Sequence, residues 1–207
     1  IIKRPSDLAV SPSLIHVFAK SSSKLKIPDL EYVMSPASFK EGTVGLLDKV
    51  SGMTLGVWQT RPKSNGYVKI NSKNIHEPPI INPNYLSDPY DVDVLLKSIK
   101  IGRNLLSTSP LQPYLNGKTN PSNDLQTDDE LLSWARNEGI TVYHMIGTAK
   151  MGPKSDKMAV VNNELQVRGI ESLRVADASI MPAMPSGNTN APTMMIAEKA
   201  SDMILGK

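Results

Sequence analysis

The spacing of hydrophobic and polar residues between positions 87 and 110 predicts a helix. Apolar residues recur there at intervals of three and four, as on one face of a helix: Val92, Leu95, Leu96 and Ile99. Ser87 or Asp88 suits the N-cap before this stripe, and Pro89 suits the first turn because its missing N–H is not needed there. The polar residues 107–110, which close with a proline, mark the end of the helix.

A second helix is predicted to begin at Thr127, after a polar and turn-rich stretch over 110–126 that is typical of a surface loop. Thr127 and Glu130 have the spacing of a capping box, in which each side chain bonds the other residue's backbone N–H. Apolar residues then supply one side of the helix: Leu131, Leu132 and Ala135. Gly139 suits the position just past the helix, where glycine accepts a left-handed conformation.

Shorter apolar runs in the first third of the chain predict strands of an antiparallel sheet. These runs span 30–34, 54–59 and 67–70, and Leu55 and Val57 alternate with other residues in the second run. The pair Asn65–Gly66 before the third run suits a tight turn with positive φ angles. Residues 14–19 predict either a short helix or a strand, and we interpret His16 within them as a packed residue rather than a ligand.

Towards the C-terminus, residues 140–143 form a β-branched and aromatic run that predicts a strand ending at His144. Three short extended pieces follow at 159–161, 165–167 and 173–176. A last helix is expected to open at Pro192, with Asn190 or Thr193 as its cap.

Composition narrows the classes of function. The chain has 207 residues, of which 40% are hydrophobic, enough for one large domain or two small ones. Its net charge is only +3 and its basic residues are scattered, so nucleic-acid binding is not expected. The absence of cysteine excludes disulfides, thiolate catalysis and cysteine-based metal sites, and its three histidines are too far apart in sequence to predict a metal site.

Targeting signals are equally sparse. No apolar run approaches the roughly 20 residues that span a bilayer, and the first residues lack the apolar stretch of a signal peptide. The chain starts without a methionine, from which we expect that it begins inside a longer protein. A cytoplasmic location is expected, with membrane association left open.

Two segments near the C-terminus contain the residues best suited to chemistry. His144 precedes Gly147, where backbone can approach another molecule closely, and histidine titrates in the range that suits a general base. The loop 186–193 gathers asparagines and threonines at a predicted helix start, whose free N–H groups favour an electron-rich partner. A structural histidine and an ordinary polar cap are the competing interpretations.

Longer stretches around these segments resemble the C-terminal signature of the GMC (glucose–methanol–choline) flavin oxidoreductases. The resemblance rests on residues 144–148, 173–182 and 187–200, with support from 82–87 and weaker support from 28–31. It is closest to the choline dehydrogenase-like and alcohol dehydrogenase-like branch. The chain departs from the family where Met145–Ile146 replaces a proline-containing pair and where Ala149 stands in place of a frequent cysteine.

The resemblance implies an α+β fold: an antiparallel-sheet substrate domain with flanking helices, plus a C-terminal segment that completes an FAD-binding α/β domain missing from this chain. The substrate-binding domain would cover 1–141, and the segment 142–207 would carry the catalytic residues. The family binds FAD through an N-terminal Gly-x-Gly-x-x-Gly loop, and no such pattern occurs here. The N-terminal FAD-binding domain of the same protein is therefore the expected partner.

The resemblance also implies a reaction and roles for individual residues. An alcohol would be oxidised by FAD: His144 would take the hydroxyl proton, Asn188 would bond the same oxygen, and hydride would pass to the flavin. Tyr143 would face the substrate, and four residues would lie against the flavin: Asp177, Ala178, Thr189 and Asn190. Two alternatives are a lyase without net redox chemistry on the same scaffold, and a non-catalytic binding module. The particular alcohol and the electron acceptor are left open.

Overall fold

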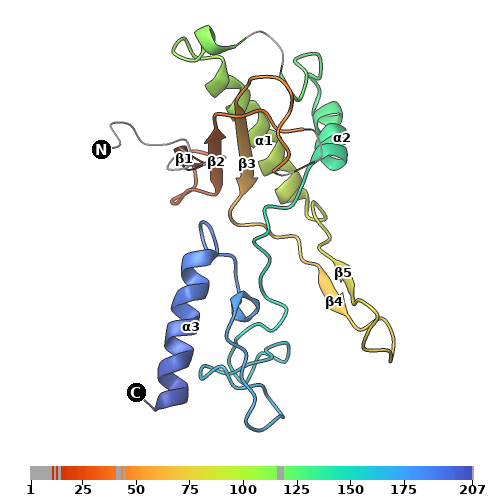
Figure 1. Cartoon of the computed structure of the whole chain (residues 1–207), viewed down its shortest axis with the longest axis vertical. Coiled ribbons are helices and arrows are strands. Elements are labelled where there is room, and N and C mark those ends of the chain that lie inside the picture. Colours follow the sequence, from red (N-terminus) through yellow and green to blue (C-terminus); the bar gives the residue numbers. More distant parts are fainter. Residues whose placement is uncertain are drawn as a thin grey trace, which may run out of the picture. The chain divides into compact units, whose positions relative to one another are not determined.

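The computed structural model describes residues 11, 13, 15–40, 43, 45–115 and 119–206 (Figure 1). These residues form two compact units. The first unit is drawn from Ile1–Thr60 and Asp88–Val142, and the second from Arg61–Ser87 and Tyr143–Lys207. The structure thus groups Arg61–Ser87 with the C-terminal residues, while the division into a substrate-binding domain over 1–141 and a catalytic segment over 142–207 stays a prediction.

The first unit contains an antiparallel sheet of three strands in sequence order, β1 (Ile15–Ala19), β2 (Leu30–Ser35) and β3 (Thr54–Gln59). The strands predicted over 30–34 and 54–59 are confirmed. Of the two forms expected for 14–19 the chain adopts a strand, and Leu14 lies outside the described residues. His16 places its Nδ1 2.9 Å from Oε1 of the fully buried Glu31 on the neighbouring strand.

Helix α1 (Pro89–Leu106) covers one face of this sheet. Its N-cap is Asp88, one of the two predicted candidates. The Asp88 side chain accepts a hydrogen bond from the Tyr90 N–H. Val94 packs against Leu30 and Tyr32 of β2, and the Tyr32 hydroxyl donates to the Ser98 carbonyl at 2.8 Å. Burial, with a smaller contribution from a nearby carboxylate, raises the pKa of Tyr32 to about 12.

The apolar stripe predicted for α1 is not the face that contacts the sheet, since Leu95, Leu96 and Ile99 belong to a separate cluster. The sheet side is lined by Val94, Ser98 and Gly102, whereas Ile99 packs against a second helix, α2 (Asp128–Glu138). The helix is therefore buried on two sides. The side that contacts the sheet includes the small and polar residues Ser98 and Gly102, and the spacing of apolar residues alone could not identify it.

Helix α2 has the predicted capping box. The Thr127 hydroxyl accepts from the Glu130 N–H at 3.2 Å, and the Glu130 carboxylate accepts from the Thr127 N–H at 2.9 Å. Gly139 follows the helix, but with φ −66° and ψ 140° it is extended rather than left-handed. A side chain there would place Cβ 2.3 Å from the Ala135 carbonyl oxygen, so glycine serves a close backbone approach.

The second unit holds a separate hairpin of β4 (Tyr67–Lys69) and β5 (Ile80–Asn82), labelled in Figure 1. The strand predicted over 67–70 is thus confirmed, but it pairs with β5 and not with the larger sheet. The predicted tight turn at Asn65–Gly66 is wrong, because neither residue has a positive φ. A Cβ on Gly66 would meet the Asn82 carbonyl oxygen at 2.0 Å, so the glycine permits the strands to approach.

The remainder of the second unit has little regular structure. The strand predicted over 140–143 is wrong: these residues are irregular, and Tyr143 has a left-handed φ of 59°. The three short extended pieces pair through isolated bridges rather than as a continuous sheet: Val161 bridges Val167 and Gln166 bridges Arg174, while Val161 also bridges Met151. Two 3-10 turns complete the described elements, η2 (Gln112–Tyr114) in the first unit and η3 (Ala178–Ile180) in the second.

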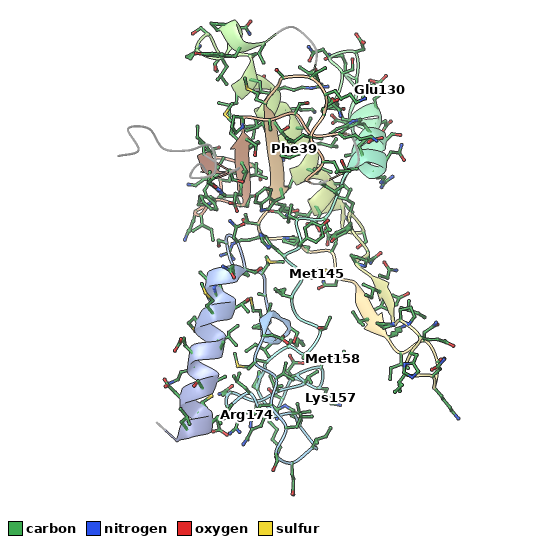
Figure 2. All side chains as sticks on the ribbon, viewed as in Figure 1. Phe39, Glu130, Met145, Lys157, Met158 and Arg174 are labelled. Carbon is green, nitrogen blue, oxygen red and sulfur yellow. The ribbon has the colours of Figure 1, made fainter. Side chains whose placement is uncertain are left out.

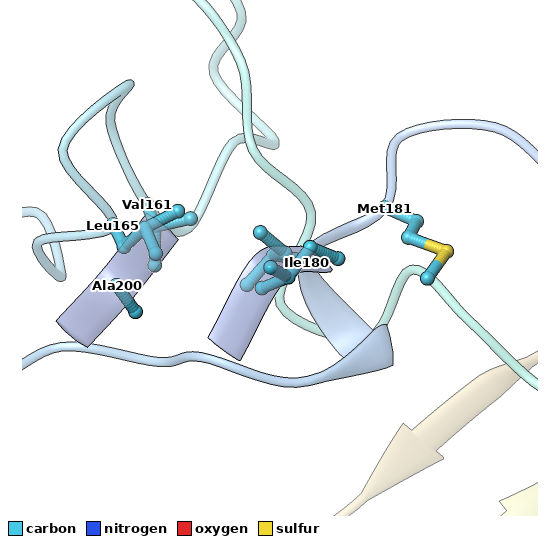
Figure 3. Close-up of a cluster of buried hydrophobic side chains, with 6 residues drawn as sticks. Val161, Leu165, Ile180, Met181 and Ala200 are labelled. Atoms are coloured by element: carbon cyan, nitrogen blue, oxygen red, sulfur yellow. The ribbon is translucent and has the colours of Figure 1, made fainter. Parts of the chain in front are cut away.

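One helix, α3 (Asn190–Leu205), closes the core of the second unit. Its Ile196 and Ala200 pack with buried residues from the bridged loops and from η3 and its end: Val161, Leu165, Ile180 and Met181. Figure 3 shows this cluster. Among the described residues, no helix has the length and apolar character needed to cross a membrane. The same residues contain no cluster of three acidic or histidine side chains arranged to hold a metal ion.

Candidate functional site

Two side chains of the second unit flank the imidazole of His144. Nε2 of His144 lies 2.8 Å from Oδ1 of Asn188, and Nδ1 of His144 lies 3.1 Å from the hydroxyl of Thr189. Both ring nitrogens therefore have a partner. The predicted pair His144 and Asn188 is brought together across 44 residues of sequence.

Local backbone geometry presents His144 to these partners. Tyr143, immediately before it, has a φ of 59°, a conformation that costs energy for a residue with a side chain. Gly147, three residues after it, has a φ of 86°, which glycine adopts without that cost. A short stretch of backbone bonds then joins this segment to η3, with the Ala149 N–H donating to Ser179 at 3.0 Å.

The start of α3 fixes the other side of the site. Thr189 is the N-cap residue and is 7% exposed. Its carbonyl accepts the Thr193 N–H at 3.0 Å and the Thr193 hydroxyl at 2.7 Å. The predicted caps Asn190 and Thr193 are therefore wrong: Asn190 is the first residue of the helix, and Thr193 lies inside its first turn.

The hydrogen bonds allow two proton arrangements on a neutral His144. If the Asn188 oxygen faces the ring, Nε2 donates to it, and Nδ1 accepts from the Thr189 hydroxyl. If the amide is turned, its NH₂ group donates to Nε2, and Nδ1 donates to Thr189 instead. Because a hydroxyl can donate or accept, Thr189 satisfies the ring in either case.

The residues predicted to lie against a flavin occupy the same unit. The carboxylate of Asp177 accepts from the N–H of Ser179 at 2.8 Å and from its hydroxyl, so it caps η3. Ala178 begins η3 and packs on the hydrophobic core, and Asn190 is exposed at the first position of α3. Contacts of these residues with a flavin stay predictions.

The first turn of α3 suits an electron-rich group such as the flavin ring. It contains no acidic residue, and the N-cap side chain makes no capping bond to it. The backbone N–H groups at its start thus have no acceptor from the cap side chain, and the positive end of the helix dipole favours electron density there. On this observation the described residues fit a bound flavin.

Exposure distinguishes the residues on either side of His144. Tyr143 is 69% exposed and Met145, labelled in Figure 2, is 57% exposed, whereas His144 is half-buried. The role of Tyr143 in substrate binding stays a prediction.

Sequence reasoning missed two contacts of the site. The Arg61 guanidinium donates to the hydroxyl of Ser186, two residues before Asn188. This bond connects the start of the segment that contains the β4–β5 hairpin to the loop that contains Asn188. The second is the bond between the Thr189 hydroxyl and His144; the contact predicted for Thr189 with the flavin stays a prediction. No sequence signal pointed to Arg61; a threonine N-cap three residues before Pro192 could have indicated a hydroxyl without its usual capping partner.

Comparison with protein families gives one match. Residues 62–197 match the family model described as GMC oxidoreductase. This range includes all the predicted site residues.

Comparison with individual proteins agrees with the family match. The chain is 38% identical to an alcohol dehydrogenase [acceptor] of Pseudomonas putida, over 100% of this chain and 37% of that protein. It is also 38% identical to an oxygen-dependent choline dehydrogenase of Staphylococcus aureus (strain JH9), over 92% of this chain and 33% of that protein. The chain thus spans about a third of the length of these relatives.

A solved structure of a formate oxidase variant, studied for FAD modification in Aspergillus oryzae RIB40, superposes with a TM-score of 0.76. It is 27% identical, and the match covers 89% of this chain and 32% of that chain. The small sheets and helices described above are consistent with a C-terminal part of this fold.

Proposed function

Because the chain belongs to the GMC oxidoreductase family, we propose that it forms part of an enzyme that oxidises an alcohol to an aldehyde or ketone. The family and its FAD-containing structural neighbours imply FAD as the cofactor. The observation that carries the proposal is the pairing of His144 Nε2 with the Asn188 side chain at 2.8 Å. Both partners can address one alcohol oxygen.

In this proposal His144 takes the hydroxyl proton of the alcohol at Nε2. Asn188 bonds the same oxygen through its amide and fixes the direction of the C–H bond. Loss of the hydroxyl proton makes the carbinol carbon a better hydride donor, and a positioned base of this kind typically contributes about 10²–10⁴-fold in rate. Bound FAD would supply the acceptor for the hydride.

Binding of the flavin is assigned to the start of α3 and to the loop before η3. The N–H groups at the first turn of α3 would face an electron-rich edge of the ring, and Asn190 at the first helical position is exposed and available. We assign Asp177 and Ala178 to the same flavin-binding surface. Their backbone groups would contact the flavin there, because the Asp177 carboxylate already bonds Ser179.

An N-terminal FAD-binding domain of the same protein is the proposed partner of this chain. Exposed apolar side chains of the second unit support a large contact surface, since monomeric proteins rarely leave such groups uncovered together. Four of them lie on α3, between 56% and 64% exposed: Met194, Met195, Ile204 and Leu205. A small alcohol is the proposed substrate, with the named activities of the two relatives as guides.

Anaerobic reduction of the flavin in the full-length protein tests this function. The purified protein is mixed with a panel of primary alcohols that includes choline, and flavin absorbance is followed without oxygen. Bleaching by at least one alcohol is the expected result, and admission of air then separates an oxidase from a dehydrogenase. A bound flavin that no alcohol bleaches would favour the lyase alternative, and a protein without flavin would favour a non-catalytic module.

A further inference from the structure

The partner of the second ring nitrogen of His144 has no role in the reaction described so far. Nδ1 of His144 lies 3.1 Å from the Thr189 hydroxyl, on a side chain that is 7% exposed. Thr189 adjoins Asn188 in sequence, so neighbouring residues serve the two nitrogens of one ring. A polar group this buried requires a partner, and its hydroxyl finds one in the imidazole.

The start of α3 makes the hydroxyl available for this bond. An N-cap threonine normally accepts the N–H of the second or third helical residue. The third residue of α3 is Pro192, which has no N–H, and Thr189 makes no side-chain capping bond. The proline therefore removes a main competitor for the hydroxyl.

The backbone of Thr189 is held independently of the ring. Its carbonyl accepts two bonds from Thr193, one from the N–H and one from the hydroxyl. Those bonds hold the backbone of Thr189 at the first turn of α3. The hydroxyl can therefore orient the His144 ring, because its own position does not depend on that ring.

We propose that Thr189 is a positioning residue for His144: its hydroxyl holds Nδ1 and determines which ring nitrogen carries the proton. For Nε2 to take a proton from an alcohol, the neutral ring must carry its hydrogen on Nδ1, where Thr189 accepts it. When Nε2 carries the hydrogen, the Thr189 hydroxyl donates to Nδ1. The ring keeps the same bond in both states. This role rests on the function proposed above.

The test uses the full-length flavin-bound protein and the variant Thr189→Val, which keeps the branched shape but loses the hydroxyl. Loss of one hydrogen bond should slow anaerobic flavin reduction at saturating alcohol about 10-fold, with little change in the alcohol concentration for half-maximal rate. Thr189→Ser restores the hydroxyl and should recover most of the rate. Ser201→Ala is the control, because it removes a hydroxyl from an exposed position further along the same helix.

A second readout observes the ring without any alcohol. Ring ¹⁵N signals of His144, assigned by their loss in His144→Gln, report which nitrogen is protonated. Two well separated signals are expected in the unsubstituted protein and in Thr189→Ser, and signals that approach each other are expected in Thr189→Val. A change in only one of the two readouts, or an equal change in Ser201→Ala, would overturn the proposal.

The two readouts also separate this inference from the proposed function. If no alcohol reduces the flavin of the unsubstituted protein, the proposed function fails, and the ¹⁵N signals still decide whether Thr189 controls the ring. If alcohol reduces the flavin and Thr189→Val matches the unsubstituted protein in both readouts, the function stands and the positioning role is wrong.

Discussion

The two units of the molecule are stabilised in different ways. In the first unit a three-stranded sheet and two helices bury their faces against one another through regular elements. In the second unit the core is formed by loops that touch through single bridges and by one helix, α3. All the candidate site residues lie in this second unit.

The first unit thus supplies regular packing, whereas the second unit supplies the residues of the candidate site. Residues such as Tyr143, with its left-handed φ, and the isolated bridges around Val161 give the second unit a backbone that orients particular side chains. Substitutions in the two units should therefore have similar effects on stability but different effects on the reaction.

The largest effect on stability is expected from two core truncations. Leu131→Ala in the first unit and Ile180→Ala in the second should each lower the free energy of unfolding by about 2–5 kcal/mol, because both side chains are buried. Only Ile180→Ala should also slow anaerobic flavin reduction, since its backbone bonds Met151 in the segment that carries His144. Urea unfolding and flavin absorbance measure the two effects, and equal loss of reduction in both variants would contradict the comparison.

Intermediate effects are expected from two glycines of the second unit that share a left-handed backbone. Gly147 has a φ of 86° and Gly169 a φ of 80°, so an alanine at either position should cost about 1–2 kcal/mol of stability. Gly147→Ala should also slow flavin reduction, because the strain would be relieved by movement next to His144. Gly169→Ala is the matched control, since a Cβ there meets no atom within 4 Å. A normal rate in Gly147→Ala would show that this turn does not position the histidine.

Local signals were sufficient to predict much of the first unit. The capping box of Thr127 and Glu130 and the helix start at Asp88 depend on residues a few positions apart, and their chemistry can be recognised in sequence. The second face of α1 was missed because Ser98 and Gly102, which line it, are not apolar. The hairpin partner of β4 was missed because strand pairing depends on tertiary contacts rather than on the turn residues.

The candidate site could be predicted only in part. The pairing of His144 with Asn188 followed from resemblance to a family, and the structure brings the two together. The bond from Arg61 to Ser186 spans 125 residues and has no local pattern. The strand expected before His144 was wrong, because β-branched residues favour an extended backbone but do not exclude an irregular one when tertiary contacts prevail.

The smallest effect on stability is expected in the first unit, from the carboxyl group of Glu130. Bonds from the backbone of Thr127, and then of Gln126, lower the pKa of the Glu130 carboxyl. A lowered pKa stabilises the folded state above the ordinary pKa of glutamate, and this contribution is lost as the pH falls through the lowered value. Glu130→Gln keeps an acceptor but does not titrate.

The urea midpoints of Glu130→Gln and the unsubstituted protein should therefore differ most near neutral pH and converge as the pH falls below the glutamate range. Flavin reduction should be unaffected at neutral pH. A gap that widens in acid would show that the carboxylate does not stabilise α2.

The most direct test of the central claim is the rate of anaerobic flavin reduction by an alcohol in full-length His144→Gln. This variant keeps a hydrogen-bonding side chain of similar reach but removes the base. We expect a rate at least ~10²-fold below that of the unsubstituted protein, with flavin content and urea midpoint nearly unchanged. A near-normal rate would contradict the assignment of the chemistry to His144 and with it the division between the two units.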